Sequence, residues 1–251
     1  MTNEANKNQS YFETQRVLFY GRTLEEYIKM FNLDLSKLKG KKILDCPAGP
    51  ASFIAEATAL GLDVVGCDPL YTDDLATMNL SGTQDVEITA TMFGSDSDLF
   101  SRKFYNSEEA LKKFGSSALA KFLEDYSQGK QENRYLKAEL PNLPFADKTF
   151  DLVLSSNLLF VYSNLNAKFG QIDDKLESMG YEFHRDAIRE LLRVTKGEVR
   201  IYPIGTQALH QYAEMVREEL EEEGIKFNLV SVEYEMVKDA NLMLRLKAPT
   251  V

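Results

Sequence analysis

The sequence predicts an α/β protein with a doubly wound, mostly parallel sheet of seven strands. Two observations lead to this prediction. An apolar segment at residues 42–46, a tight loop and an alanine-rich helix at 51–60 are followed by a second apolar segment at 62–67, which makes a βαβ unit. Apolar segments and helical patterns then continue to alternate along the chain, which favours a parallel sheet covered by helices on both faces.

The second half of the chain supplies the remaining elements. Residues 150–155 are rich in Leu and Val, as a parallel strand buried on both faces should be. The other expected elements are strands at 134–138 and 198–202, helices at 183–194 and 207–223, and strands at 226–235 and 242–246 joined by a turn at 238–241. The last two strands would form an antiparallel edge on the sheet.

Residues 71–133 interrupt the alternation of strands and helices. A structureless loop of this length would be unusual in a compact domain, so we expect a helical lid inserted at 71–133, with a helix at 107–126. Residues 23–31 carry apolar side chains at helical spacing and predict a helix within an N-terminal cover at 1–40. With no internal repeat, the whole chain, 1–251, is expected to form one domain.

Composition excludes several classes of function. No stretch approaches the roughly 18 uninterrupted apolar residues of a membrane span, and residues 1–10 lack the apolar region of a secretory signal, so we expect a soluble, cytoplasmic protein. The net charge of -10 would repel a nucleic-acid backbone. Two histidines, with Cys46 and Cys67 as buried thiols, leave almost no material for a metal site.

A strand that ends at Asp45 is followed by small residues: Pro47, Ala48 and Gly49 precede the start of a helix. Small side chains let backbone N–H groups approach a ligand closely, although any tight turn between a strand and a helix uses similar residues.

Asp68 ends the next strand, 23 residues beyond Asp45, and precedes Pro69. A carboxylate at this separation can accept hydrogen bonds from both hydroxyls of a ribose, and it would repel a 2′-phosphate. The alternative is a side-chain turn before the proline. Glu139 lies at a later strand end, where its carboxylate could accept from an exocyclic amine while the N–H of Leu140 meets the ring. Together these positions favour a cofactor that contains adenosine.

The sequence resembles the class I S-adenosylmethionine (SAM)-dependent methyltransferases. The resemblance rests on the segment Leu-Pro-Phe-x-Asp-x-x-Phe-Asp at 143–151, and, for a bacterial methyltransferase-like branch of unassigned substrate, on the segments at 20–22, 45–50, 157–162 and 198–203. It spans roughly residues 16–246 apart from the insert, and it implies the Rossmann-like methyltransferase fold.

The resemblance also implies roles for individual residues. Asp45 and the loop at 47–49 would lie against the methionine part of SAM, and Asp68 and Glu139 would bind its adenosine. The strand end that faces the sulfonium would consist of Ser155, Ser156 and Asn157. On the N-terminal segment, Tyr20 would line the cofactor site and Arg22 would pair with the SAM carboxylate, unless it serves in a salt bridge of its own.

The loop departs from the family pattern of three glycines. Only Gly49 remains, with Pro47 and Ala51 in the outer positions. Proline has no N–H to donate and fixes its own φ angle, so the loop is stiffer and offers one donor fewer.

Methyl transfer from a sulfonium requires alignment of the acceptor and exclusion of water. A general base helps only an acceptor that arrives protonated. The candidates are Tyr162, placed just past a strand end, then His184, for which capping or packing is the alternative, and Tyr20. Aromatic residues of the insert suggest an apolar or aromatic small-molecule acceptor, and the alternative is that they only bury the lid: Phe93, Phe100, Phe104, Tyr105 and Phe114.

Two other functions remain open at this stage. A nicotinamide-dinucleotide enzyme would use the same ribose carboxylate, but it normally has the full glycine pattern. A non-catalytic SAM-binding or scaffold protein would keep the cofactor pocket and close the acceptor pocket.

Overall fold

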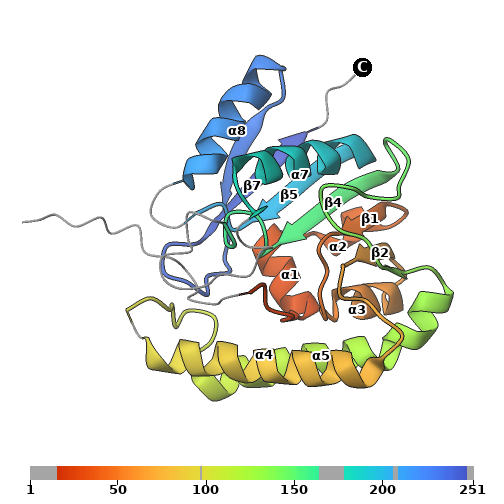
Figure 1. Cartoon of the computed structure of the whole chain (residues 1–251), viewed down its shortest axis with the longest axis vertical. Coiled ribbons are helices and arrows are strands. Elements are labelled where there is room, and N and C mark those ends of the chain that lie inside the picture. Colours follow the sequence, from red (N-terminus) through yellow and green to blue (C-terminus); the bar gives the residue numbers. More distant parts are fainter. Residues whose placement is uncertain (1–15, 97, 164–177, 206–208, 248–251) are drawn as a thin grey trace, which may run out of the picture.

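The computed structural model describes residues 16–96, 98–163, 178–205 and 209–247. Its centre is a seven-stranded sheet of order β3-β2-β1-β4-β5-β7-β6 (Figure 1). The strands are β1 (Lys42–Asp45), β2 (Asp63–Cys67), β3 (Tyr135–Leu136), β4 (Phe150–Ser156), β5 (Thr195–Tyr202), β6 (Phe227–Ser231) and β7 (Leu242–Lys247). β7 is antiparallel to both β5 and β6, and the other pairs are parallel. The predicted fold class and its antiparallel edge are confirmed.

The strand order and register indicate where on the sheet a ligand would bind. Asp45 of β1 pairs with Gly66 of β2 on one side and with Leu154 of β4 on the other. From β1 the following strands are added toward one edge of the sheet, and from β4 they are added toward the other edge. The strand order therefore reverses between β1 and β4. In open α/β sheets, ligands bind beyond the carboxyl ends of the strands at such a point.

Helices cover both faces of the sheet, and two apolar cores result. The helices α1 (Leu24–Phe31), α3 (Phe53–Ala59), α4 (Leu75–Ser95) and α5 (Glu108–Gln131) contribute to one core. On the opposite face, α7 (Tyr181–Val194) and α8 (Gln211–Glu222) contribute to the other core. A short helix, α2 (Leu35–Leu38), leads into β1. The helix predicted at 207–223 is shorter, since α8 begins at Gln211 with His210 as its N-cap; residues 206–208 lie outside the described part of the chain.

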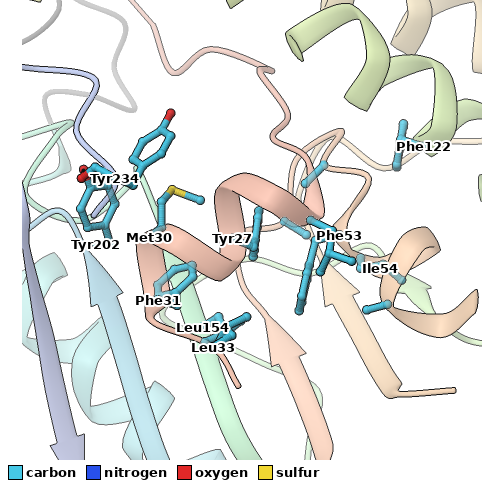
Figure 2. Packing of buried hydrophobic residues seen from close by; sticks show 14 of the residues in the cluster. Tyr27, Met30, Phe31, Leu33, Phe53, Ile54, Phe122, Leu154, Tyr202 and Tyr234 are labelled. Carbon is cyan, nitrogen blue, oxygen red and sulfur yellow. Dashed lines mark hydrogen bonds between the residues drawn. The ribbon is translucent and has the colours of Figure 1, made fainter. Parts of the chain in front are cut away.

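Helix α1 is fixed by its own sequence and by the sheet. The Thr23 side chain accepts a hydrogen bond from the N–H of Glu26, whose carboxylate accepts from the N–H of Thr23, a capping box. The apolar side of α1 packs toward the sheet, where the Tyr27 ring stacks on Phe53 at 4.4 Å (Figure 2). The helix predicted at residues 23–31 is confirmed.

Residues 71–133 contain two long helices rather than one. The helix expected at 107–126 is α5, which runs into β3 and therefore also connects β2 to β3. Sequence reasoning missed α4, which lies beside α5 (Figure 1). A Cβ added at Gly82 of α4 would lie 2.6 Å from a methyl carbon of Leu119, so glycine allows the two helices to approach closely.

Two strands are shorter than predicted. β3 covers two of the five residues expected at 134–138, because the chain turns at 139–142. β6 ends at Ser231 rather than at residue 235. The chain then leaves the edge of the sheet, and Val237 forms a bridge with Phe100 of the insert. The predicted turn at 238–241 is thus part of a longer connection.

No described helix combines the length and the apolar character that crossing a membrane would require.

Candidate functional site

A cavity of about 430 Å³ lies at the carboxyl ends of β1, β2 and β4. Most of the predicted site residues line it: Tyr20, Arg22, Pro47, Ala48, Gly49, Asp68, Pro69, Glu139, Leu140, Ser156, Asn157 and Tyr162. Three predicted residues do not line it: Asp45, Ser155 and His184. The volume lies in the range of small-molecule sites.

The loop between β1 and α3 supplies space rather than hydrogen-bond donors. Pro47 and Pro50 have no N–H, and each remaining N–H of residues 46–52 donates within the chain. The acceptors are the carbonyl oxygens of Leu154, Cys67, Ala48 and Arg22, and a carboxylate oxygen of Asp68. The first residues of α3, 53–55, do not line the cavity. The expectation that backbone N–H groups of this loop face a ligand is therefore wrong, because the protein itself uses them.

Asp68 accepts hydrogen bonds from the backbone and also lines the cavity. One carboxylate oxygen accepts from the N–H of Gly49 and the other from the N–H of Leu70, each at 2.9 Å. The second bond is the side-chain turn that the sequence allowed. The residue is buried and still lines the cavity.

Asp45 lies beneath the cavity. It is fully buried, and the Tyr27 hydroxyl donates a 2.8 Å hydrogen bond to one of its carboxylate oxygens. Burial raises the pKa of Asp45 well above its ordinary value. Tyr27 lines the cavity, and its hydroxyl also lies 3.4 Å from the Ser156 hydroxyl. Tyr27, not Asp45, therefore lines the cavity at this point, and sequence reasoning placed Tyr27 only among the apolar residues of a helix.

The end of β4 contributes alternate residues. Ser156 and Asn157 line the cavity, and Asn157 adopts a positive φ of 53° with its N–H bonded to the Tyr202 carbonyl oxygen. Ser155 points to the other face of the sheet, because successive side chains of a strand alternate. Its hydroxyl is buried and has no hydrogen-bond partner among the described residues.

The N-terminal segment closes one side of the cavity. A Cβ at Gly21 would lie 2.0 Å from the Pro50 carbonyl oxygen, so only glycine permits this approach to the loop. Asp85 of α4 holds the segment, since it accepts two hydrogen bonds from Arg16 (2.6 and 2.9 Å) and one from the N–H of Phe19 (2.6 Å). Arg16 also lines the cavity, and no pattern in the sequence marks this residue.

Tyr20 and Arg22 lie together on this segment. The Arg22 guanidinium is 5.1 Å from the centroid of the Tyr20 ring. The Tyr20 hydroxyl points toward Gly115 of α5 and has no hydrogen-bond partner in the described part of the chain. Burial raises the pKa of Tyr20 well above its ordinary value, which opposes a role as a base. Arg22 is almost fully buried and lies 3.9 Å from a Glu26 oxygen, the salt bridge that the sequence allowed.

Tyr162 lies at the side of the cavity beyond the end of β4. Its hydroxyl oxygen accepts a 3.3 Å hydrogen bond from the N–H of Leu18. Burial raises the pKa of Tyr162 to about 12, so the hydroxyl stays protonated at neutral pH and is a hydrogen-bond donor rather than a base.

His184 serves the core rather than the cavity. Its Nδ1 hydrogen-bonds the Gly180 carbonyl oxygen at 2.8 Å, which makes Nδ1 the donor, and its Nε2 accepts from the N–H of Phe160 at 3.2 Å. Burial lowers its pKa to about 4. Both nitrogens are thus used, and the packing role that the sequence allowed describes the residue better than a catalytic one.

His210 and Ser163 are hydrogen-bonded, but the protonation of His210 does not allow it to activate Ser163 as a nucleophile. The His210 Nδ1 accepts from the N–H of Tyr212, so Nε2 carries the proton and donates to the Ser163 hydroxyl at 3.1 Å. A general base would need a free lone pair at this nitrogen. Among the described residues, no group of three or more metal-ligating side chains occurs either.

The aromatic residues of the insert do not shape the cavity. Phe93, Phe100 and Tyr105 are buried in the core, and Phe104 and Phe114 pack against it. The prediction that these residues shape the acceptor pocket is therefore wrong. Apolar lining comes from other residues, which sequence reasoning missed: Val17, Leu18, Leu158, Val161, Met179 and Phe183. On the opposite side, α4 contributes Ser81 and Thr89.

Known proteins with sequence or structural similarity were found. Residues 114–202 match the methyltransferase domain family. An uncharacterized protein of Methanocaldococcus jannaschii is 26% identical over 242 residues, which cover 94% of this chain and 99% of that protein.

Two solved structures are similar at low identity. Magnesium protoporphyrin IX methyltransferase from Synechocystis with bound SAM is 14% identical, with a TM-score of 0.43 over 85% of this chain and 73% of that one. A SAM-dependent methyltransferase from Aquifex aeolicus is 13% identical, with a TM-score of 0.42 over 89% and 93%. Part of this chain, residues 114–202, is thus similar to the methyltransferase domain family, and its sheet has the order described above.

Proposed function

We propose that this protein binds SAM in the cavity and transfers its methyl group to a small-molecule acceptor. One observation supports SAM above other adenosine cofactors. The loop at 46–52 has no N–H left for a ligand, while Asp68 presents a carboxylate beside it. A dinucleotide places its pyrophosphate on such a loop and needs those donors. SAM has a ribose but no phosphate, so this loop disfavours the nicotinamide alternative and suits SAM.

The lining residues fit the parts of SAM in turn. Asp68 would accept hydrogen bonds from the ribose hydroxyls, and Glu139 and Leu140 would contact the adenine. The methionine part would lie near Pro47, Ala48 and Gly49, whose small side chains leave room. Arg22 would pair with the carboxylate, because the residue lines the cavity and its Nη1 makes no hydrogen bond to any described residue.

SAM supplies an activated methyl group on a sulfonium, so the protein has to align the acceptor and exclude water. The end of β4, at Ser156 and Asn157, would face the sulfonium. Beyond it, the apolar lining would hold the acceptor beside Tyr162. We assign no general base, because the protonated Tyr162 and the core-bound His184 are both unsuited to that role.

The N-terminal segment and α4 would cover the bound molecules. Arg16, Ser81 and Thr89 reach the cavity from these two elements, and Asp85 ties them together. This arrangement supports the predicted lid and cover. The apolar space beyond β4 supports catalysis over a non-catalytic SAM-binding role, in which an acceptor pocket would be closed.

Calorimetric titration with S-adenosylhomocysteine (SAH), SAM and NAD tests the cofactor. We expect SAH and SAM to bind one per chain and NAD not to bind; binding of NAD alone would overturn the proposal. A screen of small apolar phenols, thiols and amines with methyl-labelled SAM tests the transfer. Binding of SAH without any labelled product would favour the non-catalytic alternative.

A further inference from the structure

A buried polar cluster joins three distant segments of the chain. Glu26 comes from the first turn of α1, Tyr105 from the connection between α4 and α5, and Tyr234 from the connection between β6 and β7. All three are fully buried. The Tyr105 hydroxyl donates to a Glu26 carboxylate oxygen, and the two tyrosine hydroxyls are 2.7 Å apart. The Tyr234 hydroxyl also lies 3.3 Å from the same Glu26 oxygen.

This cluster holds one edge of Arg22. The Nε of Arg22 donates to the Tyr234 hydroxyl at 3.3 Å and lies 3.9 Å from the Glu26 carboxylate. Its Nη2 contacts the Met236 sulfur at 3.7 Å. These contacts use Nε and Nη2 of the guanidinium, whereas Nη1 has no partner among the described residues and the residue lines the cavity. Arg22 is therefore held at two of its three nitrogens.

We propose that Glu26, Tyr105 and Tyr234 are positioning residues that orient the Arg22 guanidinium toward the carboxylate of the bound cofactor. The inference rests on the proposed function, which assigns that carboxylate to Arg22. An arginine side chain has many rotamers, and fixing it before the ligand arrives removes part of the entropic cost of binding. Glu26 also balances the charge of Arg22, which permits its burial.

The cluster gives the insert a role in cofactor binding. Tyr105 belongs to residues 71–133, yet its hydroxyl acts on Glu26, which belongs to α1. Tyr234 packs against Tyr202 of β5 at 5.8 Å, beside the end of α1 (Figure 2), so the cluster is anchored to the sheet. The insert is thus connected to the end of the site that recognises the amino-acid part of the cofactor, and not only to its cover.

Two ligands separate this role from a purely structural one. SAH carries the amino-acid carboxylate, whereas 5′-methylthioadenosine has the same adenosine and sulfur without it. We expect Tyr105→Phe and Tyr234→Phe each to weaken SAH binding by about fivefold and to change 5′-methylthioadenosine binding by less than about twofold, since only the first ligand uses Arg22. Tyr126→Phe, another buried tyrosine of the insert but outside the cluster, is the matched control and should change neither affinity.

A double-mutant cycle tests whether the tyrosine acts through Arg22. In an Arg22→Gln background, Tyr105→Phe should have no further effect on SAH binding, because the group that it positions is gone. Thermal unfolding of each variant checks that the fold is retained. Two results would overturn the inference and leave the cluster as a structural contact. One is that Tyr105→Phe weakens the binding of both ligands equally, and the other is that its effect on SAH affinity adds fully to that of Arg22→Gln. If Arg22→Gln itself fails to discriminate between the ligands, the assignment of Arg22 in the proposed function fails first.

Discussion

The Tyr27 hydroxyl donates a 2.8 Å hydrogen bond to Asp45 and separates that carboxylate from the cavity. The other oxygen of Asp45 is buried without a partner in the described part of the chain. Tyr27 is therefore the only described side chain that satisfies this carboxylate by a hydrogen bond.

The variant Tyr27→Phe tests this contact. It leaves both oxygens of a buried carboxyl group unsatisfied and should lower the free energy of unfolding by about 1 to 3 kcal/mol. Urea denaturation measures the change, with Tyr126→Phe as the control for loss of a hydroxyl from the same core. Equal stability of the two variants would show that the bond to Asp45 contributes nothing.

Parts of this arrangement could be predicted from the sequence. The βαβ unit and the two acidic strand ends follow from local patterns, and the sheet then brings the residues around Asp68, Glu139 and Asn157 to one cavity. The burial of Asp45 could not be predicted, because it depends on how α1 packs over the sheet and on the bond from Tyr27, and no local pattern in the sequence shows this packing.

Helix α4 shows a second limit. It has few charged residues and no strong apolar stripe, so its sequence shows neither a buried side nor a solvent-exposed side. Its place is fixed by contacts with α5, such as Gly82 against Leu119, and by the bond from Asp85 to the N-terminal segment. The lining residues Arg16, Ser81 and Thr89 escaped prediction for the same reason.

Asp68→Ala should weaken SAH binding by about tenfold, because ribose hydroxyls lose a buried acceptor. The loss should be equal for 5′-methylthioadenosine, which has the same ribose, in contrast to substitutions of Arg22. Calorimetric titration with both ligands measures this pattern. Asp74→Ala, which removes the exposed N-cap of α4, is the control. Unchanged affinity in Asp68→Ala would remove this residue from the site.

Gly21→Ala should destabilise the protein by about 2 to 3 kcal/mol, because the new methyl group would overlap the Pro50 carbonyl group of the loop. The matched control is Gly94→Ala, where the added Cβ meets only the flexible Glu108 side chain. We expect that control to be neutral or slightly stabilising, since alanine favours a helix. Thermal unfolding compares the two, and a stable Gly21→Ala protein would contradict the close approach of segment and loop.

His184 and His210 should make the protein less stable at acidic pH. His184 and His210 have folded-state pKa values of about 4, lowered by burial from an ordinary value near 6.5. Between these pH values the unfolded chain binds protons that the folded chain does not, so stability is full above pH 6.5 and decreases as the pH falls toward 4. At pH 5 each histidine should cost about 2 kcal/mol.

Urea denaturation at pH 7, 6 and 5 measures this slope. In His210→Asn the slope should be about half as steep, since one titrating group is removed while an oxygen can still accept from the N–H of Tyr212. An unchanged slope in that variant would assign the acid sensitivity to other groups.

The central claim is that this cavity binds an adenosine cofactor without phosphates. Calorimetric titration of the full chain with SAH and, separately, with NAD tests it most directly. We expect saturable binding of one SAH per chain and no heat of binding from NAD. Binding of NAD with no binding of SAH would contradict it.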